Sequence, residues 1–186
     1  MITSREELRV CLKADSKNYQ LRTSGWLRRL RNDMGVTPIA NQKYIWKYIK
    51  TLRYLEFYTN SGKLLHLPLL VYYRYRLNRL SVKTGFQIPP NVVGSGMTIW
   101  HWGPIIINQD TQIGKNVTLN PFVVIGHKVS GGGCPIIGDH CFVGSGAKIF
   151  GDIHIGNNVT IAPNAVVVKD VPDNTIVGGV PAKSLK

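Results

Sequence analysis

The chain has 186 residues, of which 44% are hydrophobic and 18% charged, and its 23 basic against 10 acidic residues give a formal net charge of +13. This composition is typical of a globular protein with one sizeable core, or with a core and a small second unit. The longest apolar run, KLLHLPLLVYY at 63–73, has about half the roughly 20 residues that a membrane-spanning helix needs, which argues against a membrane span.

The cysteines, Cys11, Cys134 and Cys141, are odd in number and lack the spacing of metal ligands. The chain also opens without the charged and apolar segments of a secretory leader. Both features favour a reducing compartment, and we expect a cytoplasmic protein.

The charge is unevenly distributed along the chain. Residues 1–83 hold 17 basic and 5 acidic residues and all eight tyrosines, whereas residues 84–186 hold 6 basic and 5 acidic residues. This change in composition predicts two units: a basic N-terminal unit over 1–83 and a second domain over 84–186.

The N-terminal unit contains two segments with helical character, WLRRLRNDMG at 26–35 and KYIWKYIKTLRYLEFYTN at 43–60. In the second segment, apolar side chains share one face at helical spacing, while Lys43, Lys47, Lys50 and Arg53 spread over the rest. Three more arginines follow in YYRYRLNRL at 72–80. Two interpretations remain open: contact with an anionic partner such as a membrane surface, or the solvated face of a helical cap on the next domain. No nucleic-acid-binding motif accompanies the charge, and we expect no nucleic-acid partner.

The second domain repeats an aliphatic residue every six positions. Glycine often follows the aliphatic residue, and a small apolar residue often lies four positions after it. The pattern starts at Val93, slips by two residues between His101 and Ile107, and continues to Val167 and Val171. The in-phase residues are Ile107, Ile113, Leu119, Ile125, Ile137, Val143, Ile149, Ile155, Ile161 and Val167.

A period of six is typical of a β-helix, in which each hexad forms a short strand and a turn and three hexads close one triangular coil. The fold class we predict is therefore mostly β: a parallel β-helix of roughly three to four coils, preceded by a small α-helical N-terminal unit. A β-sandwich is the alternative, but its strands do not keep strict six-residue phase over this length.

The hexads, together with VVGSGMTIWHWGPIIIN at 92–108 and GGVPAKSLK at 178–186, resemble the hexapeptide-repeat acyltransferases. The similarity is greatest to the serine acetyltransferase branch and its relatives in polysaccharide gene clusters, and it covers residues 84–186. The resemblance implies a left-handed β-helix, a homotrimer with active sites between subunits, and acetyl-CoA as co-substrate, with no metal.

Transfer of an acetyl group to a hydroxyl needs a general base, and histidine suits this role near neutral pH. His101 lies at the phase slip between two tryptophans, where the relatives have their catalytic histidine, and we predict it to be the base. His127 opens the loop GHKVSGGGCP, which replaces a regular hexad, and we predict a role in acceptor contact. His140 and His154, inside regular hexads, are expected to point outward.

The sequence departs from true serine acetyltransferases at three positions. The aspartate that pairs with their histidine corresponds to Phe86, a second acidic residue to Trp100, and a later histidine to Cys134. Two tryptophans suit stacking on a sugar ring, so we expect the acceptor to contact Trp100, Trp102 and Asn108. Cys134 has no apparent base nearby in the sequence, which argues against a cysteine nucleophile.

Coenzyme binding requires small residues along the pantetheine arm and a cation near the phosphates. By resemblance, we assign these roles to Gly146, Ala147, Ala162, Lys169 and Lys183.

These expectations add up to an acetyl-CoA-dependent O-acetyltransferase acting on a sugar hydroxyl in surface polysaccharide synthesis, with possible association at the periphery of the inner membrane. The alternatives are serine O-acetyltransfer, N-acetylation of an amino sugar, and a non-enzymatic scaffold that docks on a membrane or acidic polymer. A zinc site of the β-helical carbonic anhydrase type is not expected, because the histidine spacings do not suggest three converging ligands.

Overall fold

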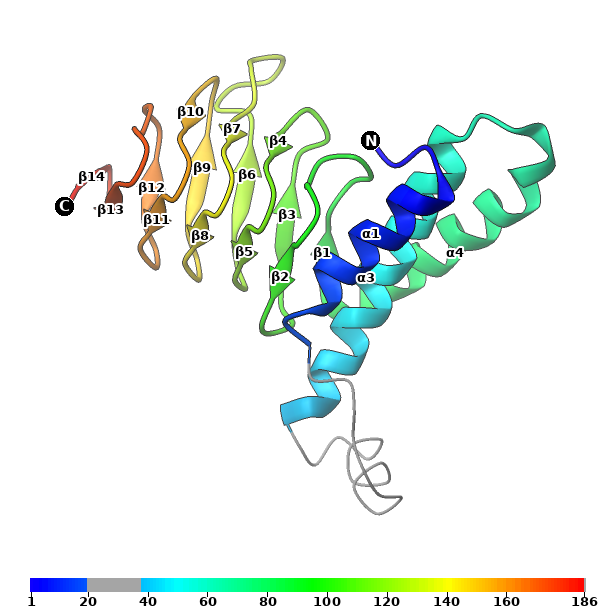
Figure 1. Cartoon of the computed structure of the whole chain (residues 1–186). Helices are drawn as coiled ribbons and strands as arrows, with labels where there is room; N and C mark the ends of the chain where they lie inside the picture. The colour runs from blue at the N-terminus through cyan, green and yellow to red at the C-terminus, as the bar shows by residue number, and fades with distance from the viewer. Residues whose placement is uncertain (20–37, 186) are drawn as a thin grey trace.

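The computed structural model describes residues 1–19 and 38–185, with the side chains of 38–41 excepted, and consists of three α-helices followed by a β-helix (Figure 1). The helices are α1 (Arg5–Ser16), α3 (Pro38–Asn60) and α4 (Leu67–Thr84), and a short 3-10 helix, η1 (Leu64–His66), precedes α4. The helix expected at 26–35 lies outside the described residues.

The helix ends follow from local sequence. Ser4 caps α1, because its hydroxyl accepts the Glu7 N–H and the Glu7 side chain accepts the Ser4 N–H in return. Pro68 stands in the first turn of α4, and Gly85, with φ 79°, ends it in the left-handed conformation that glycine adopts without strain. The chain enters the first strand at Phe86, two residues after α4.

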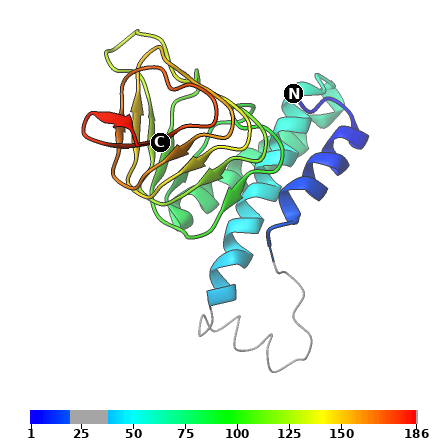
Figure 2. The same ribbon diagram turned by 60° about the vertical axis from the view of Figure 1, so that its left-hand side comes forward.

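Fourteen short strands build the three faces of a triangular prism (Figure 2). Sheet A contains β1 (Phe86–Gln87), β3 (Ile105–Ile107), β6 (Val124–Gly126), β9 (Lys148–Phe150) and β12 (Val166–Val167). Sheet B contains β4 (Gln112–Ile113), β7 (Ile136–Ile137) and β10 (His154–Ile155). Sheet C contains β2 (Thr98–Ile99), β5 (Thr118–Leu119), β8 (Phe142–Val143), β11 (Thr160–Ile161), β13 (Ile176–Gly179) and β14 (Ala182–Ser184). All pairs are parallel except β13 with β14, and the domain is the predicted left-handed parallel β-helix.

The register confirms the hexad pattern. On sheet A, Ile107, Ile125, Ile149 and Val167 stack in successive coils. The other in-phase residues stack likewise on sheets B and C, Ile113 with Ile137 and Leu119 with Val143. At the phase slip, Ile105 and Ile107 both point inward from one strand, β3, so the two extra residues lie in the corner before it.

The β-helix has one more rung on sheet A than the aliphatic pattern suggests. Phe86 pairs with Ile105 and is fully buried, so an aromatic ring occupies the place of an aliphatic side chain in the first rung. The expected three to four coils therefore undercount the stack, because they were counted from Val93 to Val171, whereas the stack runs from β1 to β13.

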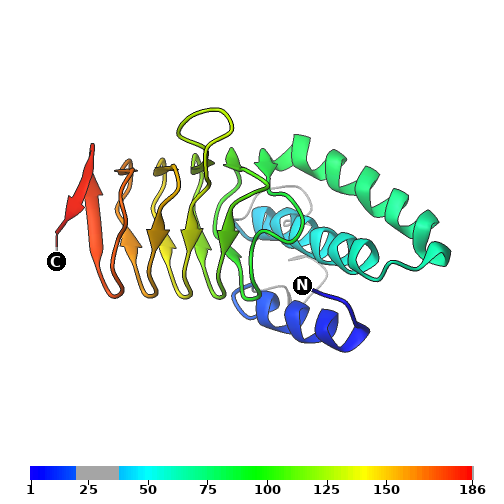
Figure 3. The same ribbon diagram turned by 90° about the horizontal axis from the view of Figure 1, so that it is seen from above.

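The N-terminal helices cover the open end of the prism (Figure 3). An apolar face of α3 forms one core cluster with the first coil, and Tyr48 packs edge-on against Phe86 at 5.1 Å between ring centroids. The buried residues of this face are Ile45, Tyr48, Ile49, Leu52 and Leu55.

No described helix is both long enough and apolar enough to span a bilayer.

Polar side chains of the N-terminal unit also bind the backbone of the first coil, which has no preceding coil to pair with. The Tyr48 hydroxyl accepts the Ile88 N–H at 3.2 Å and donates to the Ile88 carbonyl at 3.3 Å. The Tyr19 hydroxyl likewise accepts the Ile99 N–H at 2.8 Å and donates to the Ile99 carbonyl at 3.3 Å. These bonds satisfy the terminal rung as a neighbouring strand would, so the rung is closed to pairing with another chain.

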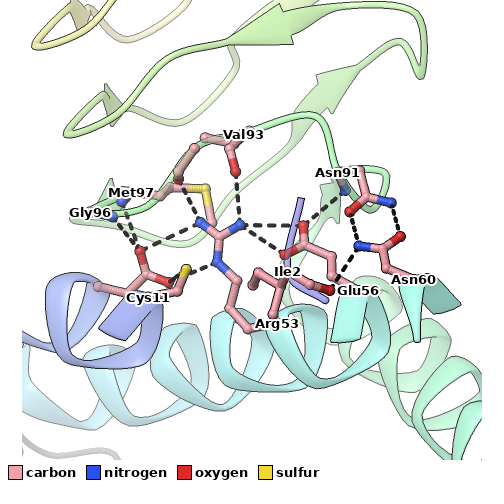
Figure 4. Close-up of polar contacts among 11 residues, drawn as sticks. Ile2, Cys11, Arg53, Glu56, Asn60, Asn91, Val93, Gly96 and Met97 are labelled. Carbon is pink, nitrogen blue, oxygen red and sulfur yellow. Dashed lines mark hydrogen bonds and ion pairs between the residues drawn. The ribbon is translucent and has the colours of Figure 1, made fainter. Parts of the chain in front are cut away.

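Arg53 is the centre of this capping network (Figure 4). Its guanidinium contacts Asp15 at 2.8 Å and Glu56 at 3.0 Å, and it donates to the carbonyls of Val93 at 2.8 Å and Gly94 at 2.7 Å. Its side chain is 2% exposed, so the expectation that Arg53 belongs to an exposed basic surface was wrong. The charge is buried because two carboxylates and two carbonyls surround it.

Candidate active site

The corners between sheets C and A lie above one another along one edge of the prism, which we call the C–A edge: residues 100–104, 120–123, 144–147 and 162–165. Glycine or asparagine occupies the third position of two corners, where Gly146 has φ 74° and Asn164 has φ 59°. Both residue types tolerate this left-handed conformation. These corners expose their middle residues along one line.

His101 lies in the first of these corners, the one with two extra residues, and its side chain is exposed. Trp100 and Trp102 beside it are 41% and 47% exposed. Trp102 also meets Tyr44 of α3 at 6.3 Å between ring centroids, so the helical cap touches this corner. Within the described residues no hydrogen bond is found for the His101 ring, so the imidazole is free to meet a group from outside the chain.

The structure places the three departures from serine acetyltransferases in different environments. Phe86 is buried against Tyr48 and offers no acceptor to orient His101. Trp100 is exposed beside His101. Cys134 lies near the corner between sheets A and B, away from the C–A edge.

Phe122 belongs to the same edge and was missed by sequence reasoning. It occupies the corner position of Gly146 and Asn164, has φ 66°, and is 58% exposed. A bulky side chain in this conformation is strained. Its ring lies against the His101 corner, since a Cβ on Gly103 would stand 4.0 Å from the Phe122 ring. The sequence could have revealed this residue by alignment of the corner NPFV at 120–123 with the corner APNA at 162–165, because Phe122 then stands where the other corner has asparagine.

The residues assigned to coenzyme binding do not all lie together. Gly146 and the half-exposed Ala162 lie on the C–A edge, and Lys183 lies on β14, paired with Gly178 at the end of sheet C. Ala147 is fully buried, and its N–H donates to Gly144 at 3.2 Å while its carbonyl accepts the Val124 N–H at 3.1 Å. The expected contact of Ala147 with the coenzyme was therefore wrong, because the fourth corner position points into the core.

Lys169 and Asn108 lie along the opposite side of sheet A, at the corners leading to sheet B, which we call the A–B edge. The Asn108 side chain accepts the Asp110 N–H at 2.9 Å, forming a local turn. Within a single chain, neither residue approaches His101, because sheet A separates the two edges.

His127 also lies on the A–B edge, at the start of the loop 127–134 that projects from the prism (Figure 3). Its Nε2 lies 3.5 Å from Asp110, and its Nδ1 lies 3.4 Å from the Cys134 sulfur. Cys134 therefore has an imidazole beside it, contrary to the expectation from the sequence.

This pair is poorly arranged for a cysteine nucleophile. The Cys134 sulfur is almost equally far from both ring nitrogens, 3.4 Å from Nδ1 and 3.8 Å from Nε2. A thiol hydrogen-bonded in line with one nitrogen would lie much farther from the other. Burial also raises the pKa of the Cys134 thiol, which opposes formation of the reactive thiolate.

Comparison with known proteins gives the same fold and repeat. Residues 134–169 match the family described as bacterial transferase hexapeptide (six repeats). The chain is 38% identical over 105 residues to a serine acetyltransferase of Mycobacterium tuberculosis, covering 55% of this chain and 46% of that protein. It is 37% identical over 105 residues to a serine acetyltransferase of Helicobacter pylori, covering 55% and 61%. The chain thus spans about half the length of the curated relatives it matches.

Among solved structures, the chain resembles the serine acetyltransferase of Neisseria gonorrhoeae in complex with serine. The TM-score is 0.66 and the identity 28%, over 98% of this chain and 71% of that one. The expectation of a sugar O-acetyltransferase from polysaccharide synthesis was wrong, because these relatives and solved structures are named serine acetyltransferases. Exposed tryptophans beside a histidine do not by themselves distinguish a sugar from serine as the acceptor. Residues 134–169 of this β-helix thus match the hexapeptide repeats of bacterial transferases.

Proposed function

We propose that the protein is an acetyl-CoA-dependent O-acetyltransferase whose acceptor is serine. The observation that supports this most strongly is the 38% identity with a serine acetyltransferase. It is joined by an exposed histidine at the one C–A corner that departs from regular stacking. An irregular corner leaves the imidazole accessible without disturbing the aliphatic stack inside the prism.

In the proposed reaction His101 acts as general base. Its imidazole takes the proton of the acceptor hydroxyl while the oxygen attacks the thioester carbonyl. The tetrahedral intermediate then expels the coenzyme A thiolate, which takes a proton from the imidazolium, so the base is regenerated. Direct transfer needs no covalent enzyme intermediate, because both substrates are bound together.

The C–A edge supplies the proposed path of the coenzyme. Successive coils are about 4.8 Å apart, so the four spacings from the His101 corner to the last coil span about 19 Å. An extended pantetheine arm running along this edge would pass Gly146 and Ala162, and its phosphates would end near Lys183. The lack of large side chains at Gly146 and Ala162 leaves room for such an arm.

We also propose that three copies of the chain assemble around the C–A edge. Exposed apolar side chains gather there, including Trp100, Trp102 and Phe122, and Ile106 on the adjoining sheet A is 40% exposed. Burial of these side chains against a neighbouring subunit would stabilise the assembly. A neighbour at this edge could also supply the orienting group that His101 lacks within its own chain.

We expect acetyl-CoA and L-serine together to give rapid release of free thiol, and acetyl-CoA alone to give almost none. The measurement is thiol release with a colorimetric reagent, repeated with threonine, glucosamine and glucose as acceptors. Coenzyme A binding is measured in parallel by calorimetry. Binding without turnover of serine would reject serine as acceptor, and absence of binding would reject the transferase proposal and favour a scaffold.

Replacement of Phe122 by asparagine should weaken the assembly without harming the fold. Asparagine tolerates φ near 66° better than phenylalanine, so we expect unfolding free energy to be unchanged or raised by about 1 kcal/mol. Light scattering after size exclusion should show dissociation at concentrations where the unaltered chain stays trimeric. Val82→Asn, at an exposed position of α4, is the matched control; a trimer as tight as the unaltered one in F122N would contradict a contact at this edge.

A further inference from the structure

Three side chains of metal-ligand type converge on the A–B edge, across sheet A from His101 of the same chain. They are Asp110, His127 and Cys134, and one donor atom of each lies within 4.8 Å of the other two. Asp110 comes from the coil that contains β4, whereas His127 and Cys134 stand at the two ends of the projecting loop 127–134. Their positions in the chain are 17 and 7 residues apart, so only folding brings them together.

The donor atoms lie close enough together to share one tetrahedral zinc ion. Ligands at about 2.3 Å for sulfur and about 2.1 Å for nitrogen or oxygen stand about 3.6 Å apart for sulfur and nitrogen and about 3.4 Å apart for nitrogen and oxygen. The observed separations are 3.8 Å from the Cys134 sulfur to His127 Nε2 and 3.5 Å from that nitrogen to the Asp110 carboxylate. The sulfur also lies 3.4 Å from Nδ1, so the imidazole must turn about its Cβ–Cγ bond to aim Nε2 at an ion shared with Cys134.

A buried hydroxyl points to the same conclusion. Thr111 is 2% exposed, and within the described residues its Oγ1 makes no hydrogen bond of adequate geometry. It nevertheless lies beside the Cys134 sulfur. An unpaired buried hydroxyl is costly, but it becomes a useful donor when the neighbouring sulfur is a metal-bound thiolate.

A local turn holds Asp110 in place, and both Asp110 and His127 are accessible to solvent. The Asn108 side chain accepts the backbone N–H of Asp110 and fixes the turn that presents the carboxylate. Asp110 is 60% exposed and His127 is 26% exposed, whereas Cys134 is buried. An ion at this place would therefore have its sulfur side inside the protein and an open side toward solvent.

We propose that Asp110, His127 and Cys134 bind a divalent transition metal, best suited to Zn²⁺, with a fourth position open to water or an external ligand. Thiolate and imidazole ligands favour zinc over magnesium or calcium, which prefer oxygen ligands. The ion ties both ends of the loop 127–134 to the neighbouring coil. Within one chain, these ligands lie across sheet A from His101.

The experiment uses untagged, chelator-stripped full-length protein kept reduced with a phosphine, and Co²⁺ as the spectroscopic probe. We expect one equivalent of Co²⁺ per chain to produce intense thiolate-to-cobalt charge-transfer absorption, and Zn²⁺ to displace it. Cys134→Ser should abolish that absorption. D110N and H127A should each weaken Zn²⁺ binding at least about tenfold, measured by competition with a chromophoric chelator.

Matched controls separate this site from other histidines and thiols. H154A removes an exposed histidine outside the cluster, and C141A removes a buried thiol of the core; both should bind as the unaltered protein does. Circular dichroism checks that each variant is folded, and D110N, which changes a 60% exposed residue, keeps the test valid if C134S does not fold. Absence of the charge-transfer band from the unaltered protein, or its survival in C134S, would overturn the proposal.

Discussion

Replacement of His101 by alanine should lower the rate of acetyl transfer at least about a hundredfold, since general bases contribute typically 10²–10⁴ in rate. The loss should appear in kcat, because the proton is removed as the acceptor attacks and the exposed imidazole does not support the fold. Initial rates of thiol release from acetyl-CoA with serine as acceptor measure the effect. Circular dichroism and size exclusion of the variant should match those of the unaltered protein.

Two further measurements distinguish a base from a merely structural histidine. Added imidazole should restore part of the lost rate in H101A, because a small base can enter the space left by the side chain. His154→Ala, at another exposed histidine of the β-helix, should keep nearly full activity. Equal rates for H101A and the unaltered protein would remove His101 from the mechanism, whatever the acceptor.

Replacement of Arg53 by methionine should lower the free energy of unfolding by about 3–5 kcal/mol, the cost of breaking a buried ion pair from one side. Methionine fills similar space but leaves Asp15 and Glu56 buried without their cation (Figure 4). Burial acts to lower the pKa of the Arg53 guanidinium, but Glu56 and Asp15 together raise it above its usual value, so the charge is kept. The carbonyls of Val93 and Gly94 would also lose their donors.

Urea unfolding followed by circular dichroism measures this effect. The matched control is Arg76→Met, because Arg76 is exposed on α4 and its guanidinium donates to the Tyr72 hydroxyl at 2.9 Å. We expect the control to lose less than about 1 kcal/mol. Equal losses for the two variants would mean that the capping network does not stabilise the junction of helices and β-helix.

The buried network also explains why the net charge of the N-terminal unit does not by itself reveal the role of that unit. Asp15 accepts the N–H groups of Gly96 at 2.6 Å and Met97 at 3.0 Å, and Glu56 accepts the Asn91 N–H at 2.9 Å. The helices thus carry out the capping role that was one of the two interpretations of this unit. Contact with a membrane surface stays a prediction that rests on the exposed lysines and arginines.

The β-helix could be predicted because the sequence pattern that specifies it is local and repeated. Every coil must place an aliphatic side chain inward at each face, so a period of six in residues such as Ile107, Ile113 and Leu119 has few other structural solutions. The same repetition made the slip at His101 and the break after Ile125 visible as exceptions, and the register shows that the loop there is an insertion between consecutive faces, not the replacement of a hexad. Loops at such exceptions were expected to carry function, and His101 remains the proposed base.

Other features depend on contacts between residues far apart in the chain. The amino-acid order shows Arg53 as one of many cations, and only packing of α3 on the first coil, with Asp15 from α1, makes it a buried anchor. Likewise, no ligand motif joins Asp110, His127 and Cys134, because they meet only when one coil stacks on the next. Periodic burial is recorded in the order of residues along the chain, whereas convergence of polar groups depends on which coils and helices become neighbours in space.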